Sequence, residues 1–121
     1  MTDKLICAWL SRHAPTVHQR QSLWQYDILQ IDPPDRFRSA SHAWSLACKD
    51  CHRKPDLFVV VLPDHFIVQF VELVAVFAPQ VPVLQARMLP PTYERWSGEW
   101  RALNIINGNL DWYSWKPEAY L

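Results

Sequence analysis

Glycine is scarce in this chain, with only Gly98 and Gly108 among its 121 residues. The dinucleotide-binding pattern G-x-G-x-x-G and the phosphate-binding pattern G-x-x-x-x-G-K-[ST] both need closer glycines than these two. The nucleophile elbow G-x-S-x-G is absent for the same reason. We therefore expect no bound NAD, FAD or other cofactor, and no P-loop nucleotide site.

An excess of either charge is also missing. Twelve basic residues balance twelve acidic ones, so the formal net charge is zero. Because no overall positive field attracts a polyanion, we expect no long nucleic acid as a partner, and any anion site must be local.

Long apolar runs are absent as well. The most apolar region, Leu57 to Ala86, is interrupted by Pro63 and Asp64 and contains Glu72. It falls short of the ~20 uninterrupted apolar residues of a membrane helix. The first residues show no signal-peptide cleavage pattern, and three cysteines in such a chain are typical of reduced thiols. We expect a soluble, cytoplasmic protein with no membrane partner.

What the chain does have is a globular composition, with 50% hydrophobic residues, 20% charged residues and seven tryptophans. Its length suits one domain, residues 1–121, with one core. The residues Leu5 to Leu10 predict a buried strand, and Thr16 with Gln19 form a capping box for a helix over 17–25. A second strand is predicted over Tyr26 to Ile31, closed by Asp32 and two prolines.

Further along the chain, Ser39 or Ser41 can cap a helix with a regular apolar stripe, made by Ala40, Ala43, Trp44, Ala47, Cys48 and Cys51. Leu57 to Leu62 predicts a strand buried on both faces, and Asp64 is the expected N-cap of a helix over 65–77. Strands are predicted over 81–88 and 100–106. The aromatic tail from Asp111 onward is expected to pack on the domain.

This alternation of strands and helices predicts an α/β fold, with a Rossmann-like, mostly parallel sheet of about five strands and helices on both faces. Ligands of such sheets bind beyond the carboxyl ends of the strands. The residues expected at that rim are Ser11, Arg12, His13, Asp32, Asp64, His65 and Arg87.

The letters Ser11-Arg12-His13 stand where the first strand gives way to the first helix. There Arg12 can grip a phosphate and His13 can exchange a proton near neutral pH. In the alternative interpretation, Ser11 and His13 only satisfy loop amides and Arg12 pairs with a carboxylate. The pattern by itself leaves both open.

Two other clusters have two interpretations each. Cys48, Cys51 and His52 match the C-x-x-C-H pattern of haem attachment, and a zinc site would need His42 as a badly placed fourth ligand. Both cysteines also lie on the apolar stripe of the predicted helix, which favours a place in the core. We therefore expect no bound metal. Trp96 and Trp100 can flank a flat base or serve as core anchors. Asn104 is a further candidate contact to a base or ribose.

In the order of its elements the chain resembles the small ring nucleases of type III CRISPR systems. Their first strand ends in a Ser-His-x-x-Thr-x-x-Gln type of turn, which corresponds here to Ser11, His13, Thr16 and Gln19, with Arg12 inserted. The likeness continues through Leu62-Pro63 and the apolar helix after it, and more faintly to the strand that holds Asn104. The inserted Arg12 and the tryptophan-rich end depart from the family pattern.

The resemblance implies a homodimer that binds cyclic oligoadenylate, commonly the four-membered ring, and cuts it to switch off CRISPR signalling. Attack by a ribose 2′-OH on the neighbouring phosphate needs no metal. His13 is then the expected general acid or base, Arg12 stabilises the phosphate charge and Ser11 orients an oxygen. Thr16, Asp64, His65, Arg87 and Asn104 complete the expected binding residues.

Two other functions remain open on the sequence. The same rim can bind or sequester the cyclic nucleotide without cutting it. Alternatively, the apolar third helix and the aromatic tail can form a protein–protein contact surface in a protein that has no ligand.

Overall fold

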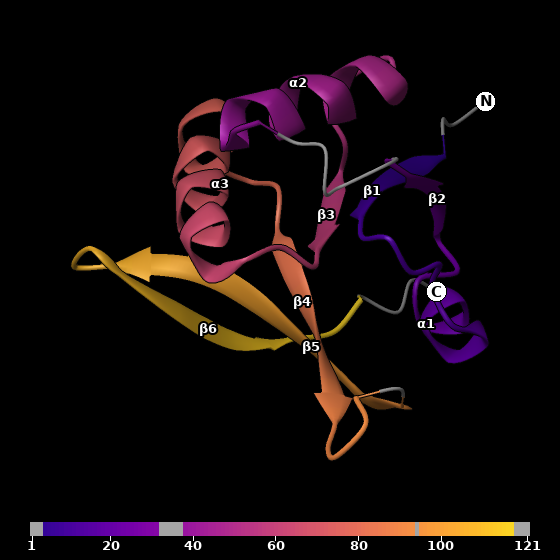
Figure 1. Cartoon of the computed structure of the whole chain (residues 1–121). Coiled ribbons are helices and arrows are strands. Elements are labelled where there is room, and N and C mark those ends of the chain that lie inside the picture. The colour runs from indigo at the N-terminus through magenta and orange to yellow at the C-terminus, as the bar shows by residue number, and fades with distance from the viewer. Residues whose placement is uncertain (1–3, 32–37, 94, 118–121) are drawn as a thin grey trace.

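A computed structural model describes residues 4–31, 38–93 and 95–117 of the chain. Within these ranges the chain forms six strands and three helices (Figure 1). Their bounds are β1 Leu5–Leu10, α1 Val17–Ser22, β2 Tyr26–Gln30, α2 Ala40–Asp50, β3 Leu57–Val60, α3 Asp64–Phe77, β4 Val83–Leu89, β5 Arg95–Ile106 and β6 Asn109–Trp115. No helix in the described ranges has the length and apolarity needed to cross a membrane.

The predicted Rossmann-like, mostly parallel sheet of five strands is wrong. The strands form one mixed sheet of six, in the order β2-β1-β3-β4-β5-β6. The first four are parallel to one another, whereas β4–β5 and β5–β6 are antiparallel. The reason is the length of the connections, because a parallel neighbour needs a crossover of a dozen or more residues. The connections after β4 and β5 are too short for that, so the chain must turn back.

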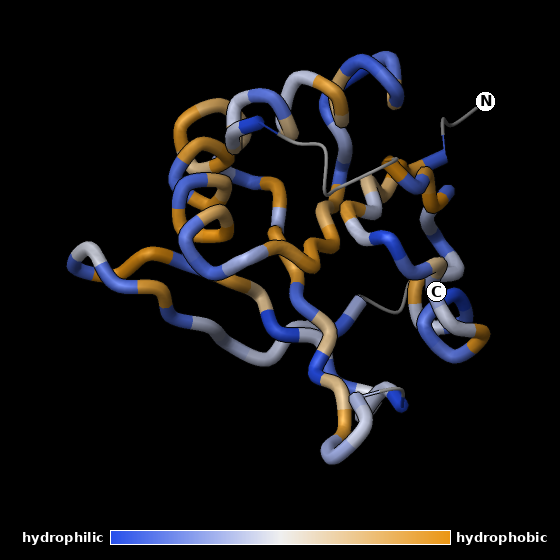
Figure 2. The backbone as a smooth tube through the Cα atoms, viewed as in Figure 1, coloured by the Kyte–Doolittle hydropathy of each residue, from blue (hydrophilic) through white to orange (hydrophobic). Residues whose placement is uncertain are grey.

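Each face of the sheet carries its own apolar cluster. On the α2–α3 face, strand residues such as Ala8, Phe58 and Val60 pack against both long helices. On the opposite α1 face, Trp9, Val59 and Trp100 pack together with Leu23, the residue that ends α1. Figure 1 shows α2 and α3 side by side on one side of the sheet and α1 apart from them, near β1 and β2. In Figure 2 the apolar colour concentrates in the central strands and α3.

The predicted caps differ in outcome. The capping box of α1 is confirmed, since Thr16 Oγ1 accepts from the Gln19 amide at 3.1 Å and Gln19 Oε1 accepts from the Thr16 amide at 2.9 Å. At α2, Ser39 is the cap and accepts from the His42 amide. Asp64 is not an N-cap, because the helix begins one residue earlier than predicted and Pro63 takes that position. Asp64 instead lies in the first turn, where its charge suits the helix dipole.

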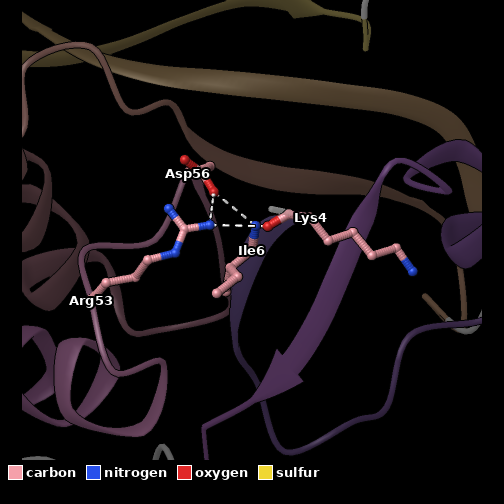
Figure 3. A network of polar contacts seen from close by, with 4 residues as sticks. All are labelled: Lys4, Ile6, Arg53 and Asp56. Carbon is pink, nitrogen blue, oxygen red and sulfur yellow. Dashed lines mark hydrogen bonds and ion pairs between the residues drawn. The ribbon is translucent and has the colours of Figure 1, made fainter. Parts of the chain in front are cut away.

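Polar contacts tie the start of β1 to the loop before β3 (Figure 3). Asp56 Oδ2 accepts from the Ile6 amide at 2.8 Å and from Arg53 at 2.9 Å. The same Arg53 nitrogen donates to the Lys4 carbonyl oxygen at 3.0 Å. These bonds satisfy backbone groups at the end of the sheet opposite to the carboxyl ends of β1 and β3.

Candidate functional site

A cavity of about 890 Å³ lies beyond the carboxyl ends of β1 and β3. It exists because β3 ends at Val60 while β4 continues to Leu89, so the second half of β4 has no parallel neighbour. Its walls come from the loop after β1, the start of α1, the end of β3, the second half of β4 and the segment before β5. The lining residues are Trp9, Ser11, His13, Ala14, Thr16, Gln19, Val59, Val60, Val61, Leu62, Gln85, Ala86, Arg87, Met88, Thr92, Tyr93 and Arg101.

The loop after β1 is held by three hydrogen bonds. Ser11 Oγ accepts from the His13 amide at 3.1 Å, and Trp9 Nε1 donates to the His13 carbonyl oxygen at 2.7 Å. Gln30 Nε2 donates to the Ser11 carbonyl oxygen at 2.8 Å. Ser11 thus satisfies a loop amide, as the structural interpretation of this residue predicted. Its hydroxyl still has a proton to donate, because a hydroxyl is both a donor and an acceptor.

Four of the predicted site residues, Ser11, His13, Thr16 and Arg87, come together around this cavity. His13 and Arg87 are exposed there, and Ser11 is buried. Arg12 lies between two lining residues in sequence, yet it is exposed and is not part of the lining. The loop therefore presents its imidazole, and not its guanidinium, to the cavity.

The other predicted residues lie elsewhere. Asp64 and His65 are exposed at the start of α3, outside the lining, and the His65 ring contacts Phe66. Asn104 lines a different, smaller hollow of about 250 Å³ between α3 and β5. Its Oδ1 accepts from the Ile105 amide. Asp32 falls outside the described residues.

Trp96 and Trp100 do not flank an open slot for a base. Their ring centroids are 4.8 Å apart, and Trp100 is only 2% exposed. Trp9 meets Trp100 edge to face at 6.3 Å, and Trp100 Nε1 donates to Ser22 Oγ at 2.9 Å. Through these contacts the two tryptophans pack in the core and connect β5 to α1.

Among the lining residues that were not predicted from the sequence, Arg101 brings a charge and Tyr93 an aromatic ring. Arg101 enters the cavity wall because β5 runs antiparallel to β4 and places Arg101 beside Gln85. Its Nε lies 3.3 Å from Glu99 Oε1, and its guanidinium lies over the Trp112 ring at 4.1 Å. Tyr93 is 63% exposed and has a φ of 57°, which is rare for a bulky side chain. Without the antiparallel topology, no local signal in the sequence points to either residue.

The described residues that line the cavity carry charge of one sign. Among the described residues that line it, two are arginines, one is a histidine and none is a carboxylate. Arg101 shares its charge with Glu99, whereas no described carboxylate pairs with Arg87. Its floor is apolar, formed by Val59, Val60 and Ala86 with their neighbours. Such a cavity suits a ligand that combines an anionic part with a flat or apolar part.

The part of the chain that the structure describes contains no group of three His, Cys, Asp or Glu side chains that could hold a metal ion. Cys7 and Cys51 are buried, Cys48 is half-buried, and all three are free thiols. Burial raises the pKa of the Cys51 thiol to about 11, and it also raises the pKa of Cys7 and of Cys48. These thiols are protonated at neutral pH.

Comparison of the chain with protein-family models, with curated proteins and with solved structures gives no match. The chemistry of the cavity is therefore the ground for a functional proposal.

Proposed function

We propose that the protein binds a cyclic oligoadenylate in the cavity after β1 and β3 and cleaves one of its phosphodiester bonds without a metal ion. The single observation that carries the proposal is the composition of this cavity. It joins an exposed histidine and two arginines to an apolar floor, with no carboxylate among the described lining residues. The resemblance of the Ser11, His13, Thr16 and Gln19 pattern to ring nucleases supplies the ligand class.

In this proposal His13 moves the proton. It takes the proton of a ribose 2′-OH as the O2′–P bond forms. The 5′-oxygen receives a proton from solvent water as the P–O5′ bond breaks, and His13 then releases its proton to solvent. The product is a linear oligoadenylate with a 2′,3′-cyclic phosphate end. The two bonds that fix the backbone of residue 13 hold its position relative to the phosphate.

Arg87 and Arg101 stabilise the negative charge on the phosphorane, because these are the arginines among the lining residues. This differs from the role that the sequence analysis gave to Arg12. Ser11 donates its hydroxyl proton to a phosphate oxygen, and the exposed ring of Tyr93 offers a stacking face for an adenine. A ring with two-fold symmetry would be shared by the two cavities of a homodimer, and a cytoplasmic location would give access to this messenger.

The test is incubation of the purified protein with cyclic tetra-adenylate in EDTA, with chromatography of the products. We expect linear oligoadenylate. His13→Ala should lower turnover by about 10²- to 10⁴-fold while leaving binding intact. His18→Ala is the matched control, because His18 is exposed on α1 outside the lining.

Arg87→Ala should weaken binding by about 1–3 kcal/mol, as the loss of a charge-assisted hydrogen bond does. Arg20→Ala removes an exposed arginine outside the lining and should change nothing. Tight binding without turnover would leave only the sequestering function. If neither binding nor cleavage is detected, the nucleotide proposal is wrong.

A further inference from the structure

Strand β6 is one of the two edge strands of the described sheet. In the described part of the chain, β6 pairs with β5 on one side and with no strand on the other. Figure 1 shows the turn between β5 and β6 at the rim of the molecule, away from α1, and the other end of β6 running back toward the rest of the sheet. Leu110, Trp112 and Tyr113 are exposed large side chains on this strand. Natural sheets protect such edges with prolines, bulges or several charges, but Asn109–Trp115 has a continuous register, no proline and one charge.

The other edge strand, β2, is different. It has five residues, and its Asp27 forms an ion pair with Lys4 at 3.0 Å. The side chain of its last residue, Gln30, turns to the Ser11 carbonyl oxygen. We therefore expect association at β6 and not at β2.

The turn between β5 and β6 shows which backbone groups face outward. Asn107 and Gly108 both have positive φ, 51° and 80°, as in a two-residue type I′ turn. In such a hairpin the closing pair, Ile106 with Asn109, is of the hydrogen-bonded kind, and the two kinds of pair alternate along the ladder. Trp112 and Ser114 therefore belong to the other kind and direct their N–H and C=O groups away from β5. The Trp112 amide donates there to Asp111 Oδ1 at 2.8 Å, so the outward pairing groups are those of Ser114 and the carbonyl of Trp112.

We infer that two copies of this chain associate through antiparallel pairing of β6 with the partner's β6, about a two-fold axis at Ser114. This register places Trp112 opposite the partner's Lys116 and Tyr113 opposite the partner's Trp115. The two-fold axis repeats each pair, so the dimer has two cation–π contacts between Trp112 and Lys116 and two aromatic contacts between Tyr113 and Trp115. The result is a continuous sheet across both copies.

Proline placement agrees with this register. Pro117 falls opposite Asp111 in a pair that is not hydrogen-bonded across the dimer, so its missing N–H removes no bond there.

The dimer also brings the two cavities to one axis. Arg101 pairs with Ser114 across β5 and β6. Two Arg101 residues would thus lie three strand spacings apart, roughly 15 Å, on the same face of the joined sheet. A two-fold symmetric anion could contact both. This last consequence rests on the proposed function, whereas the dimer does not.

Sedimentation of the full chain over a concentration series tests the dimer. We expect the wild type to be a dimer. Ser114→Pro should raise the dissociation constant of the dimer by about tenfold or more, because proline lacks the N–H that residue 114 directs away from β5. The hydrogen bonds between β5 and β6 do not use that N–H. Ser114→Ala keeps the backbone donor and should remain dimeric. A wild type that is monomeric at every concentration, or a folded Ser114→Pro protein that dimerises normally, would overturn the inference.

A second variant gives a positive signal that does not depend on tolerance of proline. Ser114→Cys brings two thiols together at the axis, at a Cα separation compatible with a disulfide. Under oxidising conditions we expect a covalent dimer on a non-reducing gel, and none with Cys placed at Leu29 on the β2 edge. Absence of cross-linking at position 114 contradicts the register. Binding of cyclic tetra-adenylate is measured in a separate experiment. Loss of the dimer contradicts the pairing of β6, whereas absence of binding contradicts the nucleotide site.

Discussion

The parallel half of the sheet is buried, whereas the antiparallel half is largely exposed. In the parallel half, all four residues of β3 are buried, because helices and neighbouring strands cover both faces. In the antiparallel half, six of the seven residues of β6 are exposed. Parallel sheets occur almost only when both faces are covered, whereas antiparallel sheets tolerate water on one side. The parallel half therefore holds most of the core, and the hairpin is a surface for contact.

The candidate cavity lies at the border between these halves. Its histidine comes from the parallel half and Arg101 from the hairpin, with β4 shared by both. A site at this border depends on how the hairpin is fixed to the sheet.

The largest expected effect is in the parallel core. Phe58 is fully buried, with its ring 5.1 Å from Phe70 and 5.7 Å from Trp44. Phe58→Ala should lower the free energy of unfolding by about 3–5 kcal/mol, because it leaves a cavity. Ile106→Ala, at a residue 48% exposed at the end of β5, should cost less than about 1 kcal/mol. Urea unfolding measures both, and equal costs would contradict the division into core and surface.

The next effect concerns the contacts of Figure 3. Asp56→Ala leaves the Ile6 amide without its acceptor and should lower the free energy of unfolding by about 1–3 kcal/mol. Arg53→Ala removes the more exposed partner and should cost about 0–1 kcal/mol. Thermal unfolding of the two variants gives the order, and a larger loss for Arg53→Ala would show that the ion pair dominates.

A smaller effect is expected at the hairpin turn. Gly108 has a φ of 80°, and a Cβ added there would meet no atom within 4 Å. The cost of Gly108→Ala is therefore backbone strain alone, about 1 kcal/mol. Hydrogen exchange should show faster exchange of β6 amides and unchanged β3 amides. Equal acceleration in both strands would mean that the hairpin unfolds only with the whole domain.

The thiols add a pH dependence that begins outside the neutral range. Burial raises the pKa of Cys51 from 9.0 to about 11, so the folded state holds a proton that the unfolded state releases earlier. The stabilisation is fully present below pH 9 and is lost as the pH rises toward 11. Urea midpoints measured across this range should fall, and less so in Cys51→Ala. A Cys51→Ala protein with the same slope as the wild type would exclude this thiol as a cause.

Local patterns predicted much of the parallel half. The capping box of Thr16 with Gln19, the stripe on α2 and the apolar run of β3 depend on neighbours along the chain, so they are readable from sequence. The tail from Asp111 was expected to pack on the domain. Its described part does so by pairing with β5 as most of β6, and Trp115 packs against the cluster on the α1 face. The other side chains of β6 are exposed, as antiparallel edge strands often leave them.

The candidate site was predictable only in part, for a related reason. His13 and Thr16 follow a recognisable turn, so their place at a strand end could be foreseen. Which side chain of that turn enters the cavity depends on the bonds that Trp9 and Gln30 make to it, and Gln30 comes from another strand. Arg101 depends on the direction of β5.

The sequence by itself determined the elements: capped helices, buried strands, the absence of glycine loops and the absence of a membrane-length apolar run. Periodicity and capping act over a few residues, which is why they can be read directly. Only the tertiary structure decided that the last strands turn back antiparallel, that Arg101 and not Arg12 joins His13, and that β6 is left as an open edge. Those outcomes depend on pairing between segments distant along the chain, and pairing is selected by the packing of the whole sheet.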